Sequence, residues 1–320
     1  MKVLIIKLTS MGDLMHTLPA LTDASQEIKG IKFDWVVDKK FSEIPKWHPA
    51  VNQIIETEHR EWRKHLFKLK TRNALKQSLD RINKTNYDLI LDMQNNLKSS
   101  FISYLCKQKV QGMNKHSVRE YPAHWAYSES YNIPKKQHAI ERQKQLLAFA
   151  FGYEYQNNIL NYGIEKSSFI KPDLELPKKY AVLVQNASWP SKLWSVDKWQ
   201  KIVKYLESNK IYSLFPSGNM HELERAKKIA SCSDKAMTLG FMNLNKMAYI
   251  IDQAKFAVCS DTGLAHLSSV VGTPSVTLYG PTNVDLIGTS GKNSKHLISK
   301  DQQMDSISVE QVLSATASFF

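Results

Sequence analysis

The chain has 320 residues, of which 42% are apolar, and it carries a formal net charge of +13. Single hydrophobic cores stop growing at roughly 250–300 residues, so this length predicts two domains. The sequence has neither low-complexity segments nor fixed-period repeats, which excludes a disordered chain and a solenoid.

The apolar runs are too short for a secretion signal or a membrane span. The first residues, MKVLIIKLTS, hold a shorter apolar core than the roughly 7–15 residues of a signal peptide. Elsewhere no stretch approaches the roughly 18 apolar residues that span a bilayer. We therefore expect a soluble protein that stays in the cytosol.

Short apolar runs alternate with amphipathic stretches along the whole chain. In the first half, strands are expected at residues 2–8, 33–38, 51–56, 87–93 and 109–113. In the second half, strands are expected at 180–186, 211–217, 255–261 and 274–280, and helical patterns include 139–151 and 220–230. Continuous apolar strands that alternate with helices are typical of parallel sheets covered on both faces.

A polar, proline-containing stretch at 152–180 separates the two halves and is only weakly periodic. We place the domain boundary near residue 170, which gives domains at 1–170 and 171–320 and allows the last helix to pack back on the first domain. Open α/β sheets bind ligands at the carboxyl ends of their strands. The sequence therefore predicts two doubly wound α/β domains that face each other across a cleft.

The spacing of the cysteines and the absence of common nucleotide-binding motifs argue against several kinds of chemistry. The chain has three cysteines, Cys106, Cys232 and Cys259, and no two of them have C-x-x-C spacing. An odd number without this spacing indicates reduced, mostly buried thiols without a zinc site or disulfides. The sequence contains no G-x-x-x-x-G-K-[ST] and no G-x-G-x-x-G. ATP hydrolysis and dinucleotide redox chemistry therefore lose their usual support.

The positive charge is concentrated in the first half of the chain. Residues 1–150 hold 25 Lys or Arg against 15 Asp or Glu, whereas residues 151–320 hold 18 against 15. A basic half favours an anionic partner, such as nucleic acid, a phosphorylated lipid or an acidic ligand. The alternative is a merely solubilising surface.

Two stretches that follow expected strands carry candidate functional residues. Ser10-Met11-Gly12-Asp13 ends the first strand, and three roles are open for Asp13: helix cap, ligand contact or chemistry. Ser260 and Asp261 end another strand, and Thr262 and Gly263 open a helix whose first N–H groups suit a phosphate. Asp261 suits sugar hydroxyls, and His266 follows about one turn later. The alternative is an Asp–Thr helix cap with a packing histidine.

Together these stretches resemble the lipopolysaccharide heptosyltransferases of the GT-B class. Residues 7–21, K-x-x-S-M-G-D-x-x-H-T-L-P-A-L, match the amino-terminal signature of that family. Residues 260–267 and 279–282 match its donor-site signature, and the likeness covers most of the chain. Residues 33–51 and 60–64 most resemble the type I branch, which adds the first heptose to the Kdo region of lipid A.

The resemblance implies two Rossmann-like domains, the first for the acceptor and the second for ADP-heptose, with neither metal nor cofactor. Lys192 stands at the phosphate-contacting lysine, Glu222 at a ribose-contacting acid and Met242 at an adenine-side contact. The family often has two threonines where this chain has Ala187 and Ser188, so a contact at Ala187 must use the backbone. The full set of expected donor-binding residues is Ala187, Ser188, Lys192, Glu222, Met242, Asp261, Thr262, Gly263 and His266.

Two further segments bear on the acceptor. The basic stretch 59–76 carries seven Lys or Arg, and Arg60, Arg63 and Lys64 are expected to bind acceptor phosphates and carboxylates at the cytoplasmic leaflet. Its alternative reading is a solvated helix face. The family motif D-x-Q-G-L-x-K-S becomes residues 92–99 here, with Asn95 in place of glycine. Because Asn tolerates the left-handed backbone, the turn is expected to survive.

The resemblance implies an inverting transfer of heptose from ADP-heptose to a Kdo hydroxyl of Kdo2-lipid A. We expect Asp13 to be the base, and Lys192 with the N–H groups near Thr262 and Gly263 to stabilise the leaving ADP. We also expect a hinge motion between the two domains and a monomeric protein that does not bind nucleic acid. The protein is expected to attach peripherally to the cytoplasmic face of the inner membrane. Two alternatives remain: a type II heptosyltransferase, and a non-catalytic binder of nucleic acid or anionic membrane.

Overall fold

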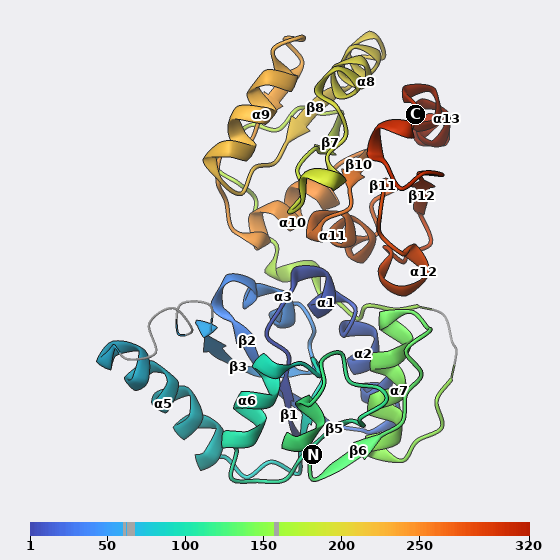
Figure 1. Cartoon of the computed structure of the whole chain (residues 1–320). Coiled ribbons are helices and arrows are strands. Elements are labelled where there is room, and N and C mark those ends of the chain that lie inside the picture. The colour runs from blue at the N-terminus through green and yellow to red at the C-terminus, as the bar shows by residue number, and fades with distance from the viewer. Residues whose placement is uncertain (60–61, 63–67, 157–159) are drawn as a thin grey trace. The chain divides into compact units, whose positions relative to one another are not determined.

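The computed structural model describes residues 1–59, 62, 68–156 and 160–320. The chain divides into two compact units, Met1–Glu165 and Lys166–Phe320. In the described residues each unit contains a six-stranded parallel sheet with helices on its two faces (Figure 1). The predicted α/β class, with a parallel sheet in each half, is confirmed.

The first unit alternates strands and helices in the order expected. Its elements are β1 (Lys2–Ile6), α1 (Met11–Met15), α2 (Leu18–Glu27), β2 (Lys32–Asp38), η1 (Lys39–Phe41), α3 (Glu43–Lys46), β3 (Val51–Thr57), α5 (Leu69–Lys84), β4 (Leu89–Asp92), α6 (Leu97–Leu105), β5 (Val110–Met113), η2 (Ala123–Ala126), β6 (Glu129–Tyr131) and α7 (Ala139–Phe151).

The second unit repeats the pattern. Its elements are η3 (Lys166–Ser168), β7 (Tyr180–Val184), η4 (Pro190–Lys192), α8 (Val196–Ser208), β8 (Tyr212–Phe215), α9 (Met220–Ala230), β9 (Ala236–Thr238), α10 (Leu244–Asp252), β10 (Phe256–Ser260), α11 (Gly263–Val271), β11 (Ser275–Tyr279), α12 (Val284–Ile287), β12 (Ser294–Ile298), η5 (Met304–Ser306), α13 (Val309–Thr316) and η6 (Ala317–Phe319).

Both sheets have the strand order of a Rossmann fold. The first sheet runs β3-β2-β1-β4-β5-β6, and the second runs β12-β11-β10-β7-β8-β9. The order therefore reverses between β1 and β4 in one unit and between β7 and β10 in the other. Loops leave such neighbouring strands in opposite directions, and the crevice between them is where doubly wound sheets bind ligands.

The central strands are buried on both faces because their sequences are continuously apolar. In the first unit, Leu4 and Ile6 of β1 pack in one cluster with Ile82 of α5 and Ile102 of α6. Helices α2 and α7 lie on the opposite face (Figure 1). Covering both faces leaves the carboxyl ends of the strands as the accessible part of the sheet.

The second unit is built around two tryptophans. Trp194 and Trp199 pack edge to face with ring centroids 5.2 Å apart, and the Trp194 indole N–H donates to the Ile307 carbonyl at 2.9 Å. Val312 of α13 belongs to the same buried cluster. The last long helix therefore packs in the core of its own unit.

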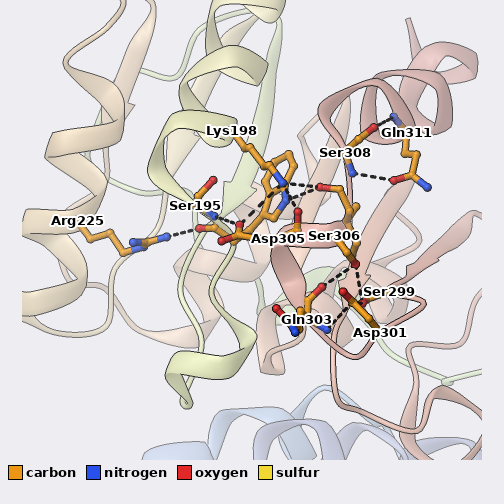
Figure 2. Close-up of polar contacts among 12 residues, drawn as sticks. Ser195, Lys198, Arg225, Ser299, Asp301, Gln303, Asp305, Ser306, Ser308 and Gln311 are labelled. Carbon is orange, nitrogen blue, oxygen red and sulfur yellow. Dashed lines mark hydrogen bonds and ion pairs between the residues drawn. The ribbon is translucent and has the colours of Figure 1, made fainter.

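Polar contacts fasten the start of α13 to α8 (Figure 2). The Ser195 N–H donates to the Asp305 carboxylate at 3.1 Å, and Lys198 Nζ donates to the Ile307 carbonyl at 3.1 Å. Ser308 caps α13: its Oγ accepts from the Gln311 N–H, and its own N–H donates to Gln311 Oε1. This reciprocal pair is a capping box, which fixes where the helix begins.

Three smaller observations complete the description. The three cysteines are free thiols, but only Cys259 is buried, so the expectation that they are mostly buried is wrong for Cys106 and Cys232. In the described ranges, no group of three His, Cys, Asp or Glu side chains is placed to hold a metal ion. Across the same ranges, none of the helices combines the length and the apolar character needed to cross a membrane.

Candidate active site

Asp13 lies in the first turn of α1, just after the loop that leaves β1 at the switch point of the first sheet. Its Oδ2 accepts hydrogen bonds from both the N–H and the Oγ of Ser10, each at 2.9 Å. Ser10 is the N-cap of α1, and Asp13 is the third residue of that helix. The structure thus gives Asp13 a capping role as the third residue of the helix, because its carboxylate completes a capping box with the N-cap Ser10.

Two cations flank the Asp13 carboxylate. Arg119 Nη1 lies 3.6 Å from Asp13 Oδ2, and the Asp13 side chain is 26% exposed. Burial of the Lys7 amine lowers its pKa to about 8, although the charge of Asp13 opposes this shift. Burial alone would raise the pKa of Asp13, but the charge of Lys7 and the Ser10 N–H outweigh it and hold that pKa below its ordinary value. Asp13 is therefore ionised at neutral pH.

The loop after β4 holds the Asp13 loop in place. Gln94 Oε1 accepts from the N–H groups of Leu8 at 2.5 Å and Thr9 at 3.1 Å. Lys7 Nζ donates to the Met93 carbonyl at 2.8 Å. The loops of the two central strands are thereby tied together, one bearing Asp13 and the other bearing Gln94.

Asp92 organises that second loop from the end of β4. Its Oδ1 accepts from the N–H groups of Gln94 and Asn95, both at 2.9 Å, and its Oδ2 accepts from the Tyr127 hydroxyl at 2.8 Å. Asn95 has a φ of +57°, so the expected left-handed turn at this non-glycine residue is confirmed. The Asn95 carbonyl accepts from the Arg119 N–H at 2.9 Å, which positions Arg119 near Asp13.

In the second unit, three segments meet at Asp261, which follows β10. Lys192 Nζ lies 2.5 Å from Asp261 Oδ2, and Thr282 Oγ1 donates to the same oxygen at 2.5 Å. Thr262 is the N-cap of α11, yet its side chain makes no capping hydrogen bond. The alternative of an Asp–Thr cap with a packing histidine is thus met in part: Thr262 holds the N-cap position and His266 is buried, but the Asp261 carboxylate pairs with Lys192 and Thr282.

Several buried polar atoms lie unpaired at the carboxyl edge of the second sheet. Each unpaired buried group of this kind costs about 1–3 kcal/mol, so a cluster of them is typical of a ligand site. The helix that begins at Gly263 adds N–H groups that have no partner within the helix. Within the described part of the chain, the side-chain atoms that lack a hydrogen-bond partner here are Gln185 Oε1, Asn186 Oδ1, Ser217 Oγ, Ser260 Oγ and Thr262 Oγ1.

Glu222 lies in the first turn of α9, beside the end of β7. Its Oε2 accepts from the Gly218 N–H at 2.7 Å and from Asn186 Nδ2 at 3.1 Å. Its Oε1 accepts from Asn219 Nδ2 at 2.8 Å. The carboxylate is thus held in a fixed orientation at the same sheet edge as the unpaired atoms.

The remaining expected donor-site residues that the structure describes lie on several segments of the second unit. Ala187 is half-buried and Ser188 is exposed in the loop between β7 and η4, and His266 is buried on α11. Met242 lines a 420 Å³ pocket together with Leu174, Phe241 and Lys246. Arg60, Arg63 and Lys64 lie outside the described residues.

Among the residues of the site that carry no role in the sequence-based hypothesis are Gln94, Arg119, Asn186 and Thr282. Gln94 and Thr282 belong to the motifs at residues 92–99 and 279–282. The motifs therefore mark these positions as candidates, but they do not predict which atoms the two side chains contact. Arg119 and Asn186 stand in no motif. Only the fold brings Arg119 to Asp13, 106 residues away in the chain.

Comparisons with known proteins agree on one family. Residues 72–316 match glycosyltransferase family 9 (heptosyltransferase). Lipopolysaccharide heptosyltransferase 1 of Escherichia coli K12 is 38% identical over 294 residues, which are 92% of this chain and 92% of that protein.

Two solved structures are similar over nearly the whole chain. The E. coli heptosyltransferase WaaC with ADP has a TM-score of 0.93 and 36% identity, with 100% of both chains covered. The same enzyme with ADP-2-deoxy-2-fluoro heptose has a TM-score of 0.90 and 35% identity, with 99% of both chains covered. The expected family, the GT-B fold and the enzyme class are confirmed: the chain belongs to glycosyltransferase family 9, the heptosyltransferases.

Proposed function

We propose that this enzyme transfers heptose from ADP-heptose to a Kdo hydroxyl of Kdo2-lipid A, with inversion, in lipopolysaccharide inner-core synthesis. The observation that carries the proposal is the meeting of Lys192, Asp261 and Thr282 at the start of α11, among unpaired buried polar atoms. The names of the relatives support the choice of sugar and of type I.

The donor half of the site suits a sugar diphosphate. Lys192 and the first N–H groups of α11 present positive charge to the diphosphate, which gains negative charge as ADP leaves. Binding of the diphosphate draws Lys192 away from Asp261, which frees that carboxylate for sugar hydroxyls. Ser188, Glu222, Met242 and His266 are assigned to the nucleoside and sugar ends of the same ligand.

The acceptor half of the site suits deprotonation of a hydroxyl near anionic groups. Asp13 is ionised and partly exposed, and the hydrogen bonds and the ion pair described for its carboxylate involve Oδ2. Oδ1 takes the acceptor proton in this proposal, while the exposed Arg119 attracts the Kdo carboxylates. Turnover then requires the two units to bring acceptor and donor together.

A turnover assay with two acceptors tests the proposal. ADP-heptose is supplied with Kdo2-lipid A or with the same acceptor already carrying one heptose, and released ADP and product mass are measured. Turnover on Kdo2-lipid A alone supports type I. Turnover only on the heptosylated acceptor points to type II, and failure to turn over ADP-heptose with either acceptor would overturn the proposed donor or acceptor.

The basic segment gives a prediction for acceptor use. Changing Arg60, Arg63 and Lys64 to Glu is expected to raise the KM for Kdo2-lipid A and leave ADP-heptose affinity unchanged. Each cation near an anionic lipid surface contributes about 1 kcal/mol, and salt screens the effect. The matched control changes Lys201, Lys204 and Lys228 to Glu, which alters the net charge equally in the other unit. Equal KM values for both variants at low salt would leave this segment as a solvated surface.

The charge of Lys7 gives a prediction for pH dependence. Burial raises the pKa of Asp13, and the charge of Lys7 is the largest of the effects that lower it. Lys7→Met should therefore raise the pKa of Asp13. Because protonated Asp13 cannot act as a base, the acidic limb of kcat/KM should move to higher pH. The check is a pH–rate profile, with Lys2→Met, at the far end of β1, as control. An acidic limb that stays in place would mean that Asp13 is not the titrating base.

A further inference from the structure

Helix α6 in the first unit exposes a stripe of apolar side chains. Its exposed face carries Leu97, Phe101 and Tyr104, with exposed fractions of 50%, 50% and 77%. These residues are spaced i, i+4 and i+7, so they form one stripe. The three serines of the helix, Ser99, Ser100 and Ser103, are buried against the unit together with Ile102. The exposed face of a helix in a soluble protein is normally polar, so an exposed apolar stripe indicates a surface that binds a partner.

The segment around η2 extends the stripe beyond the helix. Tyr121 and Trp125 are 66% and 71% exposed, and their rings pack edge to face at 5.9 Å. The neighbouring Glu120 accepts a hydrogen bond from the Leu97 N–H at 3.0 Å, which joins this segment to the start of α6. We refer to Leu97, Phe101, Tyr104, Tyr121 and Trp125 as the aromatic patch.

The chain that carries the aromatic patch is strongly basic. Residues 97–125 contain five Lys or Arg and one Glu. Glu120, the single acid, is already engaged by the Leu97 N–H. The cations are all exposed, and they are Lys98, Lys107, Lys109, Lys115 and Arg119. The partner that complements this surface should therefore offer an apolar interior covered by an anionic layer: the interior would accept the aromatic rings, and the layer would attract the cations.

An anionic lipid bilayer has both properties. Tyr and Trp side chains prefer the boundary between acyl chains and headgroups, because each has an apolar ring and a polar tip. Lys and Arg beside them gain from anionic headgroups. A second copy of this chain fits less well, because a symmetric contact would bring the same five cations against each other.

The aromatic patch adjoins the acceptor half of the site. Arg119, at its rim, lies 3.6 Å from the carboxylate proposed as the base, and the Asn95 carbonyl anchors its backbone at the foot of α6. We propose that the aromatic patch inserts into an anionic bilayer and presents the sugar of a membrane-anchored acceptor to Asp13. The proposal rests on the proposed function only for the identity of that acceptor.

Vesicle binding tests the patch without any acceptor present. The full chain carrying Phe101→Ser, Tyr121→Ser and Trp125→Ser is compared with the unaltered protein on vesicles of phosphatidylglycerol and phosphatidylcholine. The partition coefficient is expected to fall about tenfold or more. The control variant, Phe149→Ser with Ile298→Ser, removes exposed apolar side chains elsewhere and should bind like the unaltered protein. All three proteins should release ADP at equal rates with a water-soluble, deacylated acceptor, which verifies folding.

A second measurement reports insertion directly. Brominated lipids should quench part of the tryptophan fluorescence of the unaltered protein, and Trp125→Tyr should remove that quenched part while vesicle binding persists. Equal partition coefficients for patch and control variants would overturn the proposal. So would a patch-dependent dimer in sedimentation, because it would identify a second copy as the occupant. Vesicle binding without turnover on the soluble acceptor would refute the proposed function and leave the membrane surface standing.

Discussion

Replacing Lys192 with alanine is expected to lower kcat/KM for ADP-heptose about 10²–10³-fold, the usual cost of losing one group that stabilises charge in the transition state. Lys192 lies at the carboxyl edge of β7, with its amine 2.5 Å from Asp261 and close to the start of α11. The diphosphate gains charge as the anomeric C–O bond breaks, so the cation helps the transition state more than the ground state. We therefore expect a larger fall in kcat than in donor affinity.

Two further variants separate this role from a structural one. Lys201→Ala removes an exposed lysine from the same unit and should leave all constants unchanged. Asp261→Ala should weaken ADP-heptose binding, because it removes the proposed sugar contact as well as the partner of Lys192 and Thr282. Calorimetry gives the donor affinity and the release of ADP gives kcat. Normal values of both for Lys192→Ala would remove Lys192 from the donor site.

The interior of both sheets could be predicted from the sequence, whereas several edges could not. All of the expected strands are present, and the helices at 139–151 and 220–230 begin and end where the pattern places them. The strands that were not predicted are β6, β9 and β12, and each lies at a sheet edge. An edge strand is half solvated, so its sequence lacks the continuous apolar run that marks a buried parallel strand.

The candidate site shows the same division between local and distant signals. Asp13 and Asp261 could be found because each directly follows an apolar strand, and in a parallel sheet that position is the ligand-binding edge. Asn95 could be judged from its own backbone preference, and its φ of +57° agrees. Arg119 depends on a carbonyl at Asn95, and Thr282 depends on a carboxylate at Asp261. Contacts of this kind leave no periodicity in the sequence.

Changing Asp13 to asparagine is expected to lower kcat about 10²–10⁴-fold with little change in fold or in ADP-heptose affinity, since a general base contributes about that much to rate. Asn has the same shape as Asp and still accepts a hydrogen bond from Ser10, but it cannot take a proton. The lowered pKa of Asp13 does not argue against the role. The acceptor hydroxyl becomes far more acidic as it bonds to the anomeric carbon, so a weak base suffices once that bond has begun to form.

Stability supplies the internal control for Asp13→Asn. Because the folded pKa of Asp13 is depressed, its charge stabilises the fold above its unfolded pKa of about 3.9, and this contribution is lost as pH falls through the folded value. At pH 7 the variant should thus lose the charge attraction to Lys7 and Arg119, which contributes at most about 1 kcal/mol, or about 2–4 °C in Tm. At a pH below both pKa values of Asp13, folded and unfolded, the two proteins should melt at the same temperature.

A variant that melts a few degrees lower yet turns over at a near-normal rate would limit Asp13 to stabilising the start of the helix, and another group would have to be the base. A large loss of kcat with this small change in Tm identifies the carboxylate as the group that takes the proton.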